Sequence, residues 1–205
     1  ILDRDYEKGS LIEADVAINF SVPESAVSNI KLALEKKIPV VCGTTGWINR
    51  ISEVEKFCNK NNSAFLYASN FSIGVNIFFK MNKYLAKLMS PDTLDYRASI
   101  EEIHHAEKLD SPSGTAISLA EDIINSSEYE KWELGTQNKK SLKIESIRDG
   151  DNPGTHSVNY FSKLDEISIK HEAFKRDGFA LGAIIAAEWL VNKKGIFGMN
   201  DVIKF

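Results

Sequence analysis

Strand-like and helix-like segments alternate through the first third of the chain, and this alternation constrains the fold more than any other sequence feature. Short apolar runs with β-branched residues indicate three buried strands, at 14–20, 38–47 and 64–71. The segments between them, 21–37 and 48–62, favour helices. This order of elements predicts an α/β fold in which a parallel sheet is connected by right-handed crossovers.

Largely small or polar residues follow each of the three predicted strands. They occupy positions 19–21, 43–46 and 68–71. In an open parallel sheet, ligands bind at the carboxyl ends of the strands, where the connecting loops gather. We therefore expect these three segments to form one side of a ligand site.

The middle of the chain has a different pattern. The sequence predicts helices at 74–89 and 114–125, and strands at 96–105, 141–148, 156–163 and 166–174. The last three strands alternate apolar and polar residues along much of their length, and turn residues at 149–150 and 152–154 connect the first two. This pattern favours an α+β domain with an antiparallel or mixed sheet, followed by a closing helix at 179–194.

Composition and charge exclude several classes of protein. The 205 residues include 25 Lys+Arg and 29 Asp+Glu, a net charge of -4, whereas general nucleic-acid binders and membrane-surface proteins carry a basic surplus. The longest apolar run, 179–187, is shorter than the roughly 20 residues of a membrane span. The start of the chain shows no secretory signal, and we expect Cys42 and Cys58 to be reduced thiols. These features predict a cytoplasmic protein.

The segment from Glu102 to Ala116 contains the densest group of reactive side chains. His104 and His105 end a predicted strand, and Lys108 follows four residues after the first histidine. Histidine exchanges protons near neutral pH, and lysine can donate a proton or bind a carboxylate. Residues 113–115 open a helix, whose free backbone N–H groups and dipole favour an anion. Together these features indicate catalysis on a carboxylated substrate.

Each of these motifs also has a purely structural interpretation. A pair of adjacent histidines is more often a surface or packing feature than a catalytic one. Neighbouring residues of a strand face opposite sides, so His104 and His105 are poorly placed to bind one metal ion, and we expect no zinc site. The Ser-Gly-Thr step is compatible with a simple helix cap, and Gly43–Gly46 with a tight turn. Spacing alone leaves the function open.

Five ordered blocks of the sequence resemble one enzyme family. The run EIHHAEKLDSPSGTA resembles the signature of the 4-hydroxy-tetrahydrodipicolinate reductase (dihydrodipicolinate reductase) family. The blocks INFSVPE (18–24), VCGTTGW (41–47), ASNFSIGVN (68–76) and IRDGDNPGTHSV (147–158) are similar to the family in the same order. The resemblance extends from about Asp15 to the C-terminal segment and implies a two-domain enzyme of the diaminopimelate route to lysine.

The resemblance implies roles for the reactive segment. A nicotinamide cofactor would reduce a cyclic, unsaturated dicarboxylate, with His104 as proton donor or acceptor and Lys108 as proton donor. His105 would contact the substrate. The backbone N–H groups of Gly114 and Thr115 would hold a carboxylate, and Ser113 would assist.

The resemblance also implies NADH or NADPH as the cofactor. The residues that match the family's nicotinamide-lining segments are Phe20, Gly43, Thr44, Thr45, Ala68, Ser69, Asn70 and Phe71. It implies a Rossmann-like cofactor domain at 1–71 and 179–205, and a substrate-binding and tetramerisation domain at 72–178. The expected assembly is a homotetramer built through the sheet of the second domain, with no metal, nucleic-acid or membrane partner.

One feature of the family is missing from the sequence. The family begins with a strand and a turn of pattern G-x-x-G-x-M-G, whose backbone holds the pyrophosphate of the cofactor. Gly9 is the only glycine in residues 1–20. The simplest account is a chain truncated at its start, which would leave an exposed sheet edge. We therefore expect weak cofactor binding by this polypeptide as written.

Two other interpretations stay open. A non-catalytic relative that retains the tetramer-forming domain would explain the missing turn, but the intact block from Glu102 to Ala116 argues against it. A different nicotinamide enzyme, such as an aspartate dehydrogenase-like protein, would lack the complete His-His-x-x-Lys motif. Arg148 and Arg176 have no assigned role.

Overall fold

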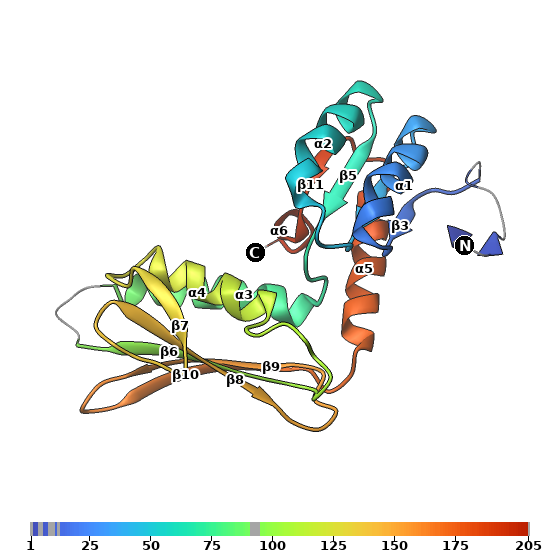
Figure 1. The fold of residues 1–205 in the computed structure, drawn as a ribbon. Helices are drawn as coiled ribbons and strands as arrows, with labels where there is room; N and C mark the ends of the chain where they lie inside the picture. The colour runs from blue at the N-terminus through green and yellow to red at the C-terminus, as the bar shows by residue number, and fades with distance from the viewer. Residues whose placement is uncertain (1, 4–5, 8–10, 12, 91–94, 205) are drawn as a thin grey trace. The chain divides into compact units, whose positions relative to one another are not determined.

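The structure is a computed structural model and describes residues 2–3, 6–7, 11, 13–90 and 95–204. The chain divides into two compact units. One comprises residues 1–72 and 179–205, and the other comprises residues 73–178. Each unit contains its own sheet and its own hydrophobic core (Figure 1).

Parallel strands form the sheet of the first unit, in the order β11-β5-β4-β3. The strands are β3 (Ala17–Asn19), β4 (Val40–Cys42), β5 (Ala64–Tyr67) and β11 (Gly195–Phe197). The helices are α1 (Pro23–Glu35), the 3-10 turn η1 (Ile48–Arg50), α2 (Ile51–Lys60), α5 (Asp177–Leu190) and α6 (Met199–Val202). A short antiparallel pair, β1 (Leu2–Asp3) and β2 (Tyr6–Glu7), precedes them. The predicted parallel α/β sheet is confirmed.

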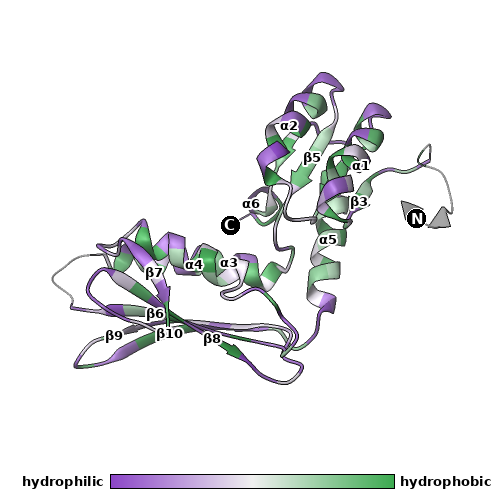
Figure 2. Cartoon of the chain, viewed as in Figure 1, coloured by the Kyte–Doolittle hydropathy of each residue, from purple (hydrophilic) through white to green (hydrophobic). Residues whose placement is uncertain are grey.

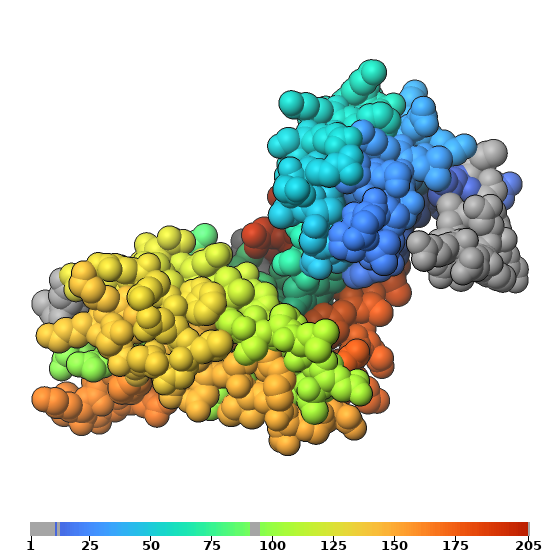
Figure 3. Space-filling view, in the orientation of Figure 1, coloured from blue at the N-terminus to red at the C-terminus, as the bar shows by residue number. Residues whose placement is uncertain are grey.

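Both faces of this sheet are buried. On one face Val40 and Phe65 pack with Ile30 and Leu34 of α1 in a single apolar cluster, which α2 joins through Val54. Val41 and Leu66 alternate with the first two residues along their strands, so they lie on the other face, and both are fully buried. The outer sides of α1 and α2 carry polar residues and form part of the surface (Figures 2 and 3). Burial on both faces explains why the sequences of these strands are continuous apolar runs.

Strand β3 lies at one end of the strand order of this sheet. Two apolar side chains at this edge, Ile18 and Phe20, are 46% and 59% exposed. The absence of a glycine-rich turn concerns residues 1–20, part of which lies outside the described residues.

The second unit combines a mixed sheet with two helices. The sheet has the order β10-β9-β6-β8-β7, in which β9 pairs antiparallel with both β6 and β10, and the other pairs are parallel. The strands are β6 (Arg97–His104), β7 (Lys131–Leu134), β8 (Ser141–Arg148), β9 (Thr155–Phe161) and β10 (Glu166–Glu172). The helices are α3 (Ile73–Leu88) and α4 (Gly114–Ile124). The predicted mixed-sheet α+β unit is confirmed.

Helices α3 and α4 cover one face of this sheet (Figure 1). Phe78 of α3 and Leu119 of α4 pack with Ile100, Ile144 and Val158 of the three central strands. Along β6 every second residue is buried, in phase with Ile100. The residues that alternate with them point to the sheet's other face and are half-buried or exposed. No helix of the described chain is both long and apolar enough to cross a membrane.

The sequence did not predict the short strands β1, β2, β7 and β11 or the short helix α6. Strand β7 has no fully buried residue, so its sequence lacks the apolar alternation of a strand. Strand β11 has three residues and exists because it pairs with β5, more than a hundred residues earlier in the chain. Such elements are determined by long-range pairing and leave little local signal.

Gly182 of α5 provides a test of packing in the first unit. A Cβ atom at this position would lie 1.8 Å from the carbonyl oxygen of Phe71, a backbone atom that has little freedom to move. We expect Gly182→Ala to lower the free energy of unfolding by about 3 kcal/mol, the upper range for overpacking. Gly178→Ala in the same helix is the matched control, because its Cβ would meet no atom within 4 Å. Urea unfolding measures both, and equal stabilities of the two variants would contradict this packing.

Candidate active site

The reactive segment lies where three central strands of the second unit reach the same end of the sheet. Strand β6 ends at His104, and β8 ends at Arg148 beside it. The loop after β6 and the loop after β8 are joined by two backbone hydrogen bonds, from Asp149 N–H to His104 C=O at 2.8 Å and from Ala106 N–H to Gly150 C=O at 3.0 Å. These bonds fix the loops relative to the sheet.

Strand register gathers a polar cluster around Glu102. Its direct neighbour on β8 is Ser146, and its direct neighbour on β9 is His156. His104 lies two residues further along β6, on the same face. Cross-strand neighbours have side chains about 5 Å apart, so this register alone brings the four side chains together.

The carboxylate of Glu102 is completely buried and fully hydrogen-bonded. It accepts the N–H of Ser113 at 3.1 Å through both oxygens, the hydroxyl of Ser146 at 2.6 Å, and the guanidinium of Arg148 at 3.4 Å. Burial by itself raises the pKa of Glu102, but hydrogen bonds from His156, Ser113 and Ser146 outweigh it and hold the pKa far below its usual value. Glu102 is therefore ionised at neutral pH.

Arg148 connects this carboxylate to the loop that follows His104. Besides Glu102, its guanidinium donates to the carbonyl oxygens of Asp110 at 2.6 Å and Lys108 at 3.3 Å. An arginine with several fixed acceptors is a rigid structural element. Arg148, to which the sequence assigned no role, therefore holds the loop after β6 against the sheet.

His104 is buried beside the carboxylate, with 7% of its surface exposed. Its Nδ1 lies 3.5 Å from Oε2 of Glu102, and its ring centre lies 4.9 Å from that of His156 in an edge-to-face arrangement. Burial and the neighbouring His156 lower the pKa of His104 to about 4, although Glu102 opposes the shift. At pH 7 the ring is therefore neutral.

His105 and Lys108 lie in the loop after β6, outside the buried cluster. His105 is half-buried, and its carbonyl oxygen accepts the N–H of Lys108 in a turn. The ammonium of Lys108 pairs with the exposed carboxylate of Asp110 at 2.6 Å, and this bond lowers the pKa of Asp110. The ammonium is thus held by a group at the surface.

Ser113 links the cluster to the start of α4. It is the N-cap of the helix, and its hydroxyl accepts the N–H of Ala116 at 3.2 Å. The same hydroxyl lies 3.1 Å from Nε2 of His156. Within the described part of the chain, the N–H groups of Gly114 and Thr115 have no acceptor, as expected for the first turn of a helix. A Cβ at Gly114 would meet no atom within 4 Å, so space is free above these donors.

Three side chains of the cluster have the chemistry of metal ligands. Ligand atoms of Glu102, His104 and His156 lie within 4.8 Å of one another, a convergence that the sequence did not predict. The oxygens of Glu102, however, already accept two N–H or O–H donors and the cation Arg148. A guanidinium within 3.4 Å opposes a second cation, so the arrangement favours a hydrogen-bonded carboxylate over a metal site.

The eight predicted cofactor residues belong to the other unit. Each lies just beyond the carboxyl end of one of three adjacent parallel strands, because Asn19, Cys42 and Tyr67 stand side by side at the strand ends. Thr45 and Ser69 are exposed, whereas Gly43, Ala68 and Asn70 are half-buried. The fold therefore gathers the three segments at one edge of the sheet, although the sequence separates them by up to fifty residues.

Two of these residues support the loops through buried side chains. The hydroxyl of Thr44 accepts the N–H of Ser21 at 2.8 Å. Phe71 is 2% exposed, and its ring meets that of Phe20 edge-to-face at 5.7 Å. The ring of Phe20 in turn lies where a Cβ of Gly43 would be, at 2.1 Å, so a side chain at position 43 would displace this ring. Phe20 itself is exposed and available for a ligand.

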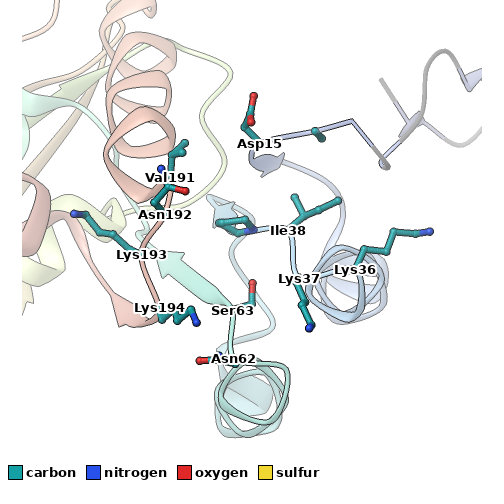
Figure 4. Close-up of a pocket in the computed structure, with 12 residues that line it drawn as sticks. Asp15, Lys36, Lys37, Ile38, Asn62, Ser63, Val191, Asn192, Lys193 and Lys194 are labelled. Atoms are coloured by element: carbon teal, nitrogen blue, oxygen red, sulfur yellow. The ribbon is translucent and has the colours of Figure 1, made fainter.

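A separate hollow of about 390 Å³ lies at the opposite, amino-terminal ends of the same strands (Figure 4). None of the predicted site residues lines it. Its lysines, Lys36, Lys37, Lys193 and Lys194, follow the carboxyl ends of α1 and α5, where the helix dipole favours cations. Figure 4 shows their side chains pointing apart, so they do not converge on a common ligand.

Comparison with known sequences identifies the family. The family described as dihydrodipicolinate reductase, N-terminus, matches residues 4–71, and the one described as dihydrodipicolinate reductase, C-terminus, matches residues 74–203. The chain belongs to the dihydrodipicolinate reductase family. A curated 4-hydroxy-tetrahydrodipicolinate reductase of Christiangramia forsetii is 50% identical over 98% of this chain and 85% of its own length. That of Archaeoglobus fulgidus is 36% identical over 95% and 78%.

Solved structures show the same fold. A dipicolinate-bound dihydrodipicolinate reductase from Paenisporosarcina sp. TG-14 has a TM-score of 0.74 with 22% identity, covering 92% of this chain and 74% of that one. A probable dehydrogenase from Thermotoga maritima has a TM-score of 0.52 with 8% identity, covering 85% and 68%. The sequence matches confirm the predicted family and the oxidoreductase class, and the fold confirms the Rossmann-like parallel sheet.

Sequence reasoning assigned no role to Glu102, Ser146, Gly154 or His156. A signal was present for Glu102, which alternates with Ile100 along β6 and so occupies a buried phase of the strand. A carboxylate at such a position is rare unless it is paired. The other three come from strands and loops more than forty residues away, and only the pairing of β6 with β8 and β9 brings them to it.

The lowered pKa of His104 predicts a pH dependence of stability. The unfolded chain takes up a proton on His104 below about pH 6.5, while the folded chain does so only near pH 4. The free energy of unfolding therefore falls as the pH drops through this window, and His104 contributes about 2 kcal/mol of the loss between pH 7 and pH 5. Urea unfolding at the two pH values measures it. His104→Gln should reduce the difference by that amount, and an unchanged difference would contradict the buried neutral ring.

Proposed function

We propose that this chain reduces 4-hydroxy-tetrahydrodipicolinate (dihydrodipicolinate) to tetrahydrodipicolinate, with NADH or NADPH as the hydride donor, in the diaminopimelate route to lysine. Membership of the dihydrodipicolinate reductase family and the names of the most similar curated relatives support this activity. The observation that carries it is the intact reactive segment, arranged around the buried carboxylate of Glu102. A relative of the same fold was solved with dipicolinate, a cyclic dicarboxylate.

The proposed carboxylate site is the first turn of α4. The N–H groups of Gly114 and Thr115 are free to donate, and the helix N-terminus adds a partial positive charge. Ser113 fixes this turn as the N-cap, and its own N–H is committed to Glu102. His105 and Lys108, in the preceding loop, are the proposed side-chain contacts of the substrate.

His104 is the proposed proton donor or acceptor. Its pKa of about 4 leaves it neutral in the free protein. A bound dicarboxylate brings two negative charges toward the ring, and nearby negative charge raises the pKa of a histidine. Binding of substrate would therefore favour protonation at the moment when a proton is needed. Lys108 would exchange Asp110 for the substrate and serve as a second proton donor.

The proposed cofactor site is the edge of the first unit's sheet formed by Phe20, residues 43–45 and residues 68–71. When bound there, a reduced nicotinamide supplies the hydride. The exposed face of Phe20 fits a flat aromatic ring, and parallel sheets bind nucleotides at this edge.

We propose a homotetramer built through the sheet of the second unit, in a reducing cytoplasm. The sheet face opposite α3 and α4 is covered by no helix of the described second unit (Figure 1). Cys42 and Cys58 are both free and buried, which is typical of a protein from a reducing compartment. Sedimentation equilibrium measures the assembly.

The decisive assay is oxidation of NADH and of NADPH by the purified chain, with substrate generated in place by the synthase that precedes this step. Substrate-dependent turnover supports the reductase. If this chain shows no turnover but a gene product extended upstream of Ile1 does, the result would support truncation. If neither protein shows turnover, the result would instead favour a non-catalytic relative that retains the second unit.

His104→Gln and Lys108→Ala test the proposed proton transfer. Losing an acid–base group lowers turnover by about 10²–10⁴-fold, and we expect kcat losses in this range. Lys87→Ala is the control for the lysine variant, because Lys87 is an exposed lysine in the last turn of α3, outside the reactive segment. Full turnover by His104→Gln would show that the proton comes from another group.

Gly114→Ala tests the carboxylate site. Because the added methyl group meets open space, the protein should remain as stable as before, whereas a substrate carboxylate would be displaced from the helix N-terminus. We expect KM for the substrate to rise about tenfold, the cost of a weakened charged hydrogen bond. Gly178→Ala, which also faces open space, is the control. An unchanged KM would place the carboxylate elsewhere.

A further inference from the structure

The two ring nitrogens of His104 lie in different surroundings. Nδ1 is buried, lies 3.5 Å from Oε2 of Glu102, and has no hydrogen bond within the usual limits. Nε2 points to the opposite side, toward Gly154, where a Cβ atom would lie 3.2 Å from it. Only one of the two nitrogens carries the proton of a neutral imidazole, so these surroundings decide which.

The carboxylate of Glu102 accepts hydrogen bonds and donates none. It is ionised because hydrogen bonds from His156, Ser113 and Ser146 stabilise its negative charge, and the guanidinium of Arg148 also donates to it. A bare Nδ1 lone pair facing this anion would be repelled, whereas an Nδ1–H would be attracted. The carboxylate therefore favours the Nδ1–H tautomer of His104.

The other side of the ring is kept open by Gly154. This residue has φ +146°, a conformation that other residues rarely adopt, and its missing side chain leaves Nε2 uncovered. His156 does not compete for this nitrogen, because its own Nε2 faces the hydroxyl of Ser113 at 3.1 Å and Oε2 of Glu102 at 3.6 Å.

We propose that Glu102 is a positioning residue that holds His104 as the Nδ1–H tautomer, so that Nε2, beside Gly154, is the nitrogen that exchanges a proton with the substrate. The tautomer follows from the geometry of the protein itself. Its use in catalysis rests on the proposed function.

Glu102→Gln should reverse the tautomer. Oε1 of Glu102 accepts from Ser146 and Arg148, whereas the N–H of Ser113 is shared by Oε1 and Oε2, so a glutamine places its carbonyl oxygen at Oε1, where most donors converge. Its NH₂ group then replaces Oε2 and donates toward Nδ1 of His104. Nδ1 becomes the acceptor, and the proton moves to Nε2. Nε2, which faces the substrate, would then already carry a proton and have no lone pair with which to accept another.

The experiment is ¹⁵N NMR of the full chain labelled at histidine, at pH 7. The chain has 4 histidines, and replacing each in turn by glutamine assigns their signals. We expect wild-type His104 as the Nδ1–H tautomer and Glu102→Gln as the Nε2–H tautomer, with kcat lowered about 10²-fold or more and KM little changed. Glu101→Gln is the matched control, because Glu101 is the preceding residue of β6 and points to the other face of the sheet. It should leave the tautomer and kcat unchanged.

The wild-type spectrum alone can overturn the proposal, since it needs neither a variant nor a substrate. Nε2–H at His104 in the wild type, or an unchanged tautomer in a folded Glu102→Gln, would do so. If the tautomers behave as expected but His104→Gln keeps full turnover, the positioning by Glu102 stands and the catalytic role of His104 in the proposed function fails.

Discussion

The second unit depends on a single buried carboxylate. Glu102 of β6 is wholly enclosed, and it accepts hydrogen bonds from Ser146 and Arg148 of β8 and from Ser113 at the N-terminus of α4. A buried charge is tolerated only when it is fully paired, so each donor must be in place before the others are stable. The same bonds hold Ser113 at the start of α4 and Arg148 over the loop that carries Lys108. The carboxylate of Glu102 therefore both stabilises the fold of the second unit and positions the residues of the proposed chemistry.

The first unit relies on a different physical constraint. Its parallel strands are buried on both faces, and hydrophobic packing of α1, α2 and the sheet fixes them without buried ion pairs among the described core residues. Parallel pairing then brings the three loops after β3, β4 and β5 to one edge. Their arrangement is tight: Phe20 fills the space above Gly43, and Thr44 accepts the N–H of Ser21. The predicted cofactor residues are thus placed by packing rather than by charge.

Most of the fold could be predicted because its long elements have strong local patterns. The helices α1, α3 and α4 and the strands β6, β8 and β9 all lie within a few residues of their predicted positions. The candidate site residues His104, Lys108 and Ser113 could be proposed because they share one short segment. His156 and Gly154 lie in the block 147–158 that resembles the family, but their place beside Glu102 and His104 could not be predicted, since it depends on the pairing of β9 with β6.

The sequence by itself determined the α/β character of the first unit, the mixed sheet of the second and the family, and it supplied the residues that we propose to move protons. These depend on apolar periodicity and on residues close together in the chain. Only the tertiary structure decided that Glu102 is buried and ionised, that it lies 3.5 Å from His104, and that Arg148 connects it to the loop. The reason is physical: register between strands far apart in sequence sets which side chains are neighbours, and the pKa of a group is set by its neighbours.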